Sequence, residues 1–147
     1  MSNVVDILNR GVSRLYRWLC LVSLKSKQSG TITADGTEQT LYERSEVERN
    51  FMFMGGYINI ENMESGDTIV VRKYKKLEPN GDWIQFLGDM TYSGAPDPKD
   101  KYIQFMVEPG WYGIKITLQQ TATGAGGYKE FEYRFDDTIG VKLREVR

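Results

Sequence analysis

The chain has 147 residues, a length that fits one domain with a hydrophobic core. It contains no histidine and a single cysteine, Cys20, which excludes histidine-based catalysis, Cys/His zinc sites and an internal disulfide. Residues 1–27 carry five basic groups and one acidic group, whereas the other 120 residues carry 14 basic and 19 acidic groups. We therefore expect the N-terminus to meet a different partner from the rest, and the acidic body not to bind nucleic acid.

Residues 4–24 have the period of an amphipathic α-helix. One half of the helical wheel is largely apolar, the other half carries arginines, and Cys20 lies near the boundary. We predict two regions: a basic helical arm over residues 1–27 and a β-sandwich over residues 28–147. The arm residues predicted to anchor the protein are Val4, Leu8, Val12, Leu15, Trp18, Leu19 and Val22 on the apolar side, with Arg10, Arg14 and Arg17 opposite.

Three roles remain open for this helix. It could cover its own sandwich, pack against neighbouring copies or another protein, or lie on a membrane surface, which Trp18 and the arginines would suit. The apolar run from Leu15 to Leu24 is short and is interrupted by Arg17. We therefore expect neither a membrane span nor a signal peptide.

From Thr31 onward the hydrophobic period changes to two, which is typical of strands with one buried and one wet face. Ile114, Ile116 and Leu118, for example, are expected to face a core, and Asn80-Gly81 predicts a hairpin turn. Eight to ten short strands indicate an all-β antiparallel β-sandwich, with a jelly roll favoured over an immunoglobulin-like topology. The predicted strands are Thr31–Ala34, Gln39–Arg44, Asn50–Met54, Tyr57–Glu61, Thr68–Lys76, Trp83–Tyr92, Tyr102–Glu108, Tyr112–Thr121, Tyr128–Phe135 and Val141–Val146.

No motif for enzymatic chemistry is present in the sequence. Phosphate-binding, dinucleotide-binding and nucleophile-elbow patterns are absent, so we expect no enzyme, no cofactor and no metal site. We interpret the paired acids Asp97 and Asp100, and Asp136 and Asp137, as solvated loop groups. The basic run Arg72–Lys76 is interpreted as a solvated edge strand that blocks unwanted pairing.

Aromatic residues offer one further candidate site. Trp83, Tyr92, Trp111 and Tyr112 could form a surface, either as an intersubunit contact or as a stacking platform for sugar rings. Core packing or an interface is the favoured interpretation, and a glycan ligand is the alternative.

Five phrases in order resemble a group of short β-sandwich proteins of archaeal viruses and related environmental genomes. They are GTITADGTEQTL (30–41), GYINIENM (56–63), GDTIVVR (66–72), TYSG (91–94) and YGIKITLQQT (112–121), and the resemblance covers about residues 30–136. It implies a virion structural protein, a capsid or capsid-associated subunit, and brings no catalytic residues.

The resemblance also implies partners and a location. We expect a self-assembling homo-oligomer that contacts other virion proteins, is made in the host cytoplasm and resides in the virion, with the helix anchoring it to neighbours or a membrane. Two alternatives are kept: a carbohydrate-binding or host-adhesion module, and a subunit of a cellular filament or sheath.

Overall fold

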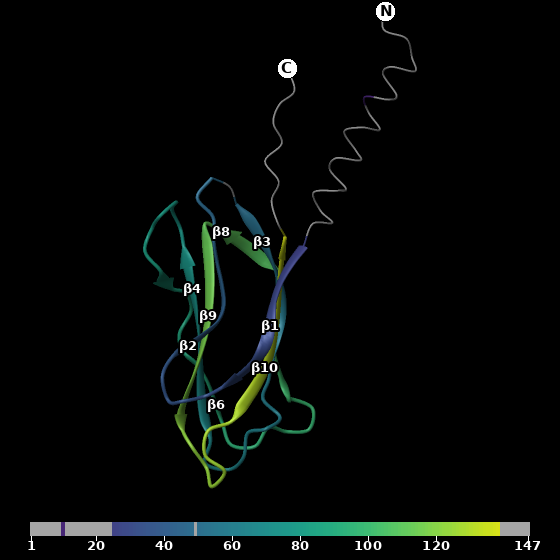
Figure 1. The fold of residues 1–147 in the computed structure, drawn as a ribbon, viewed down its shortest axis with the longest axis vertical. Coiled ribbons are helices and arrows are strands. Elements are labelled where there is room, and N and C mark those ends of the chain that lie inside the picture. Colours follow the sequence, from purple (N-terminus) through teal and green to yellow (C-terminus); the bar gives the residue numbers. More distant parts are fainter. Residues whose placement is uncertain (1–9, 11–24, 49, 139–147) are drawn as a thin grey trace, which may run out of the picture.

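A computed structural model describes residues 10, 25–48 and 50–138. In this part of the chain, two antiparallel sheets pack face to face as a sandwich (Figure 1). Sheet A contains β1 (Lys25–Thr33), β10 (Glu130–Thr138), β3 (Phe51–Asn59), β7 (Tyr102–Phe105) and β8 (Glu108–Trp111). Sheet B contains β2 (Gln39–Ser45), β9 (Gly113–Ala122), β4 (Thr68–Lys76), β5 (Ile84–Gln85) and β6 (Met90–Ser93).

The strand pairing is that of a jelly roll. β1 pairs with β10 and β2 with β9, while β3 pairs with β7 and β8, and β4 with β5 and β6. The chain therefore folds as one long antiparallel hairpin that is rolled so that β1, β2, β3 and β4 alternate between the sheets. This arrangement confirms the predicted fold class and selects the jelly roll over the immunoglobulin-like topology.

The core lies between the sheets and follows the alternation expected from the sequence. On β9, Ile114, Ile116 and Leu118 are fully buried, as predicted. Three aromatic rings then join the two sheets: those of Tyr42, Phe53 and Phe135 lie 5.3–6.0 Å apart in tilted pairs. Burial of such rings contributes much of the hydrophobic stabilisation, and tilted contacts are the geometry that aromatic pairs prefer.

β3 is one continuous strand where the sequence predicted two. The sequence analysis ends one strand before Gly55-Gly56 and begins another after them, because glycine in a strand weakens it. In the structure Gly55 has a φ of +86°, and Gly56 lies directly against β10, where the register shifts between Phe135 and Asp137. The glycines therefore allow a close backbone approach within the strand rather than ending it.

Other strand boundaries differ from the predicted ones, because the backbone pairing between strands stops earlier or later than the alternation of apolar and polar residues. The predicted strand 83–92 is replaced by the two short strands β5 and β6, and the predicted strand 102–108 is interrupted after Phe105, with pairing resuming at Glu108 on β8. Val107, in this interruption, is exposed. The predicted Asn80-Gly81 turn between β4 and β5 is confirmed, with Asn80 at a φ of +56°.

The N-terminal arm falls largely outside the described residues. Of residues 1–24 the structure describes Arg10 alone, which is helical and exposed. β1 begins at Lys25, so the predicted boundary after residue 27 falls inside a strand. The predicted strand Val141–Val146 lies outside the described residues as well.

Gly56→Ala should destabilise the fold. A methyl group at this position would lie 2.1 Å from the Arg134 carbonyl oxygen and 2.5 Å from the Phe135 ring, so β10 would have to move away. Overpacking of this kind costs about 1–3 kcal/mol, measurable by urea unfolding. Gly88→Ala is the matched control, since no atom lies within 4 Å of its added methyl. Equal stability of the two variants would contradict the close approach.

Candidate functional site

The four aromatic residues predicted to share a surface lie in separate places. Trp83 packs on the outer face of sheet B, where the ammonium groups of Lys76 and Lys115 lie 4.7 and 5.1 Å from its ring. Trp111 ends β8, Tyr92 lines a cavity between the sheets, and Tyr112 is half-buried in the β8–β9 connection. Trp83 lies against Gly113, next to Tyr112, whereas Tyr92 lies in the cavity, so a common surface of all four residues, as an interface or as a stacking platform, stays a prediction.

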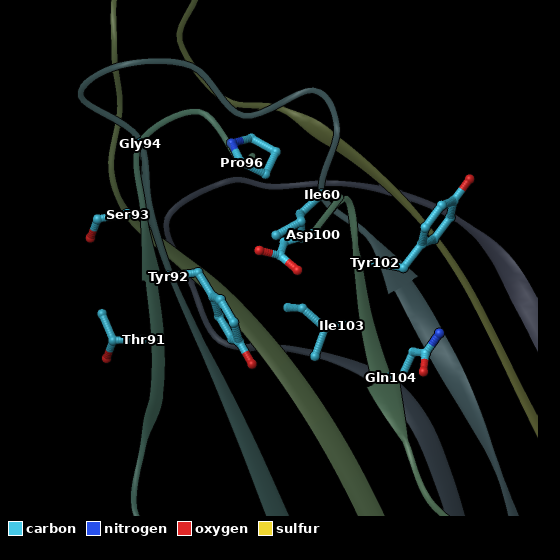
Figure 2. A pocket seen from close by; sticks show the side chains of 10 residues that line it. All are labelled: Ile60, Thr91, Tyr92, Ser93, Gly94, Pro96, Asp100, Tyr102, Ile103 and Gln104. Carbon is cyan, nitrogen blue, oxygen red and sulfur yellow. The ribbon is translucent and has the colours of Figure 1, made fainter. Parts of the chain in front are cut away.

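A cavity of about 490 Å³ opens where β6 and β7 end the two sheets side by side. Tyr92 and Ile103 point into it from opposite strands, and Pro96 and Asp100 lie at one end (Figure 2). Burial raises the pKa of the Tyr92 hydroxyl above its usual value of 10.0, because the buried site disfavours the charged phenolate. The cavity is lined by two phenols, one carboxylate, two hydroxyl side chains, one amide and two isoleucines, a composition suited to binding a ligand.

A second hollow of about 210 Å³ continues along the same edge and shares Tyr92, Ile103 and Gln104 with the first. Its rim is exposed and apolar: Leu87 is 67%, Met106 80% and Val107 54% exposed. Contiguous exposed apolar surface of this kind marks interaction sites in soluble proteins. We call this surface the apolar edge; it consists of the exposed residues Ile84, Phe86, Leu87, Met106 and Val107 and the partly buried residues Met90, Tyr92 and Phe105, with buried Ile103 beneath them.

Two backbone conformations beside the apolar edge are unusual. Leu87 has a φ of +71° and Trp111 a φ of +48°, and glycine is the residue that ordinarily adopts such angles. A left-handed conformation costs a non-glycine residue roughly 1–2 kcal/mol. Leu87 is thus held in a strained conformation while its side chain is exposed, and such strain is concentrated at functional sites.

Charged groups beneath the apolar edge are paired with one another. The Lys73 ammonium lies 2.9 Å from one Glu108 carboxylate oxygen, and the Lys75 ammonium lies 3.1 Å from the other. Lys75 is only 2% exposed, and its ammonium also lies 4.4 Å from the Trp111 ring and 4.9 Å from that of Phe86. The interpretation of Arg72–Lys76 as a solvated edge is therefore wrong: β4 lies inside sheet B, and alternate lysines point between the sheets.

The opposite edge of the sandwich is closed. On β1, the Gln28 side chain donates to the Glu43 carbonyl at 2.8 Å and accepts from the Glu43 amide at 3.1 Å. The Gln39 amide donates to the Thr33 carbonyl at 3.1 Å. These side chains link the edge strands β1 and β2 of the two sheets and occupy backbone groups that an edge strand would otherwise expose.

A buried carboxylate lies at the end of the sandwich where β1 begins and β10 ends. Asp137 is fully buried and accepts hydrogen bonds from Ser26 on β1, from Arg44 on β2 and, at 2.7 Å, from the Tyr42 hydroxyl. Arg44 also bonds Glu46 at 2.7 Å. The interpretation of Asp137 as a solvated loop acid is therefore wrong, because three strands converge on it and satisfy its charge.

The described residues contain neither a group of three or more potential metal ligands nor a helix long and apolar enough to span a membrane. The sequence analysis did not identify Leu87 and Met106 as part of the apolar edge, or Glu108 as a residue that lines its hollow. A signal was present, since the adjacent apolar pair Met106-Val107 breaks the alternation just before Pro109.

Tyr42→Phe should weaken the fold and reduce its sensitivity to high pH. Losing the hydroxyl leaves buried Asp137 without one donor, which costs about 1–3 kcal/mol at pH 7. Burial, and then the hydrogen bond to Asp137, raise the pKa of Tyr42 above its usual 10.0. The stability that this adds is present below pH 10 and is lost as the pH rises further, because the unfolded tyrosine ionises first.

The measurement is urea unfolding from pH 7 to 11, with Tyr128→Phe, an exposed tyrosine, as control. The native protein and the control should lose stability above pH 10 more steeply than Tyr42→Phe. Parallel curves for all three proteins would contradict the assigned environment of Tyr42.

Neither a protein-family model nor a curated protein matches this sequence. Among solved structures, the chain is similar to one of the infectious bursal disease virus Gx strain, with a TM-score of 0.49, 15% identity, and coverage of 79% of this chain and 32% of that chain. It is also similar to the VP2 subviral particle of infectious bursal disease virus, with a TM-score of 0.49, 14% identity and the same coverages. The chain spans about a third of the length of these viral chains. The similarity is one of fold alone, and the archaeal source expected from the sequence remains a prediction.

Proposed function

We propose that this chain is a structural subunit of a virion, a capsid or capsid-associated protein, that assembles with copies of itself. The observation that carries the proposal is the apolar edge, where Leu87, Met106 and Val107 are exposed beside a hollow between the sheets. A single small domain exposes such surface when another molecule covers it. The resemblance of residues 30–136 to sandwich proteins of archaeal viruses supports a virion as the setting.

The N-terminal arm is the proposed anchor. Its predicted apolar side, with Leu8, Leu15 and Leu19, needs a partner, and its arginines would remain on the solvent side or meet anionic lipid. The described start of β1 is paired along its length with β10, from Lys25 opposite Thr138. The β1–β10 pairing is the longest in sheet A without a register shift. An arm joined to β1 is therefore firmly anchored to its own domain, as a segment that holds two subunits together must be.

A structural role also agrees with how the buried ionisable groups are used. Lys75 is bonded to Glu108 and to the Pro109 carbonyl, and Asp137 to three side chains on the two strands β1 and β2. Asp67 accepts from the Glu64 and Gly124 amides at 2.8 and 2.7 Å. Buried charges with complete sets of partners organise loops and strands and leave no group poised for proton transfer.

Assembly is the direct test of this proposal. The full-length protein should form large homo-oligomers in light scattering and electron microscopy, and Leu8/Leu15/Leu19→Glu should reduce them to small species without changing the melting temperature of the body. Arg10/Arg14/Arg17→Glu is the matched control, because it alters the opposite side of the same predicted helix. Closed shells would support a virion subunit, whereas long filaments would favour the sheath alternative. A full-length protein that stays monomeric across salt and concentration would overturn the proposal.

A carbohydrate-binding or host-adhesion role is the second candidate, and the cavity at Tyr92 and Asp100 is the observation that favours it. A glycan in this cavity should raise the melting temperature, and Asp100→Asn should reduce that increase by removing a hydrogen-bond acceptor. Asp97→Asn, in the same loop but not lining the cavity, is the control. Unchanged melting across a broad glycan panel would exclude this candidate.

A further inference from the structure

The apolar edge and the start of β1, to which the N-terminal arm is joined, lie on opposite sides of the sandwich. β1 and β7 are the two ends of the strand order in sheet A, with β10 and β3 between them. The chain therefore enters the body at Lys25 on the closed edge, whereas the hollow lined by Leu87, Met90 and Met106 opens on the other edge. A contact that joins one edge of a subunit to the opposite edge of the next is heterologous, and it repeats into rings, shells or filaments.

We expect the occupant of the apolar edge to be apolar, elongated and part of another subunit. The chain enters the body at Lys25 on the closed edge, and the width of the sandwich separates that point from the apolar edge, which favours a helix from a neighbouring copy over the subunit's own. Its apolar residues Val4, Leu8, Val12, Leu15, Leu19 and Val22 recur every three or four positions, the spacing by which helices occupy hydrophobic grooves.

The predicted helix is long enough to cover this edge. Residues 4–24 would span roughly 30 Å as a helix. β7 (Tyr102–Phe105), the strand of sheet A at the open edge, spans roughly 13 Å. Met90 and Met106 line the hollow, and methionine adapts its shape to an apolar partner.

The charged groups beneath the hollow do not oppose this contact. Glu108 is bonded to both Lys73 and Lys75, and the Lys75 ammonium also donates to the Pro109 carbonyl at 3.3 Å. The two lysines and one glutamate leave one net positive charge, but each ammonium group already has a partner before a helix covers it. The strained backbone of Leu87, which holds its side chain outward at the rim, is explained if that side chain has a partner in the assembly.

We infer that the apolar edge of one subunit binds the N-terminal helix, residues 4–24, of a neighbouring copy. This inference rests on the proposed assembly function and names the surface and the segment that carry it. The contact is directional: each subunit donates its helix across one edge and receives a helix at the other. No additional protein is required to cover the exposed leucine and methionine side chains.

The first experiment tests the surface. Leu87→Glu/Met106→Glu in the full-length chain places two charges at exposed positions, so the body should keep its melting temperature while the large assembly is lost. Val47→Glu is the matched control, since Val47 is also exposed but lies outside the apolar edge, and it should assemble as the native chain does. Normal assembly of the double variant would overturn the inference while leaving the proposed function intact.

The second experiment identifies the occupant with the single native cysteine, Cys20, which lies on the predicted helix. Met106→Cys, oxidised with copper phenanthroline in air, should give disulfide-linked dimers and longer ladders on non-reducing gels. Thr123→Cys, at an exposed loop position away from the apolar edge, and Cys20→Ser/Met106→Cys should give markedly fewer.

The outcomes separate the two proposals. A disulfide within one chain, seen as a faster-migrating monomer, would show that the helix covers its own body and would overturn the exchange between copies. Assembled protein that forms no linkage at position 106, or links equally at position 123, would overturn it too. A native chain that never assembles would instead defeat the proposed function, and this inference with it.

Discussion

Every two-sheet sandwich has two long edges at which the sheets face each other without backbone pairing between them, and here the two edges are built differently. At the β1–β2 edge, Gln28 bonds both backbone groups of Glu43, so side chains close the gap. At the β6–β7 edge, no such link bridges the described strands, and cavities lined by Tyr92 and Ile103 remain. Because exposed strand edges and apolar surface both favour association, the open edge is where a partner gains the most contact.

Buried charges shape both ends of this arrangement. Lys73, Lys75 and Glu108 support the open edge from beneath, while Asp137 gathers Ser26, Tyr42 and Arg44 at the end where β1 begins. Charged clusters are costly to bury unless every member is bonded. Removing one partner should therefore lower the free energy of unfolding by more than the ion pair itself contributes to it. Buried charge clusters of this kind favour the one arrangement of strands that gives every charged group a partner, which is a structural role and not a catalytic one.

The jelly roll by itself does not specify a function, because viral shells, lectins and enzymes all use it. What distinguishes this chain is the combination of an apolar open edge with a predicted amphipathic arm whose sequence precedes β1, the strand at the opposite edge. A directional contact between them would generate a closed shell or a filament according to the rotation between successive subunits. The virion and sheath alternatives thus share one molecular contact and differ in its geometry.

Local sequence pattern predicted the elements whose residues carry their own signal. β4 has the predicted bounds Thr68–Lys76, the alternation on β9 held, and Asn80-Gly81 formed its turn, because the period of two and turn chemistry act between close neighbours in the chain. The topology followed from strand number and spacing, which favour a jelly roll before any contact is known.

The candidate site could not be predicted in the same way. Trp83, Tyr92 and Trp111 looked equivalent in the sequence, yet they lie on an outer face, in a cavity and beside a buried lysine. The direction of Lys73 and Lys75 and the exposure of Met106 depend on which strand lies beside which, a matter of contacts between residues 30 or more positions apart. The sequence by itself therefore determined a two-layered β body, and it predicts a basic amphipathic arm before that body. Only the tertiary structure decided which edge stays open, since side chains distant in sequence close one edge and leave the other apolar and exposed.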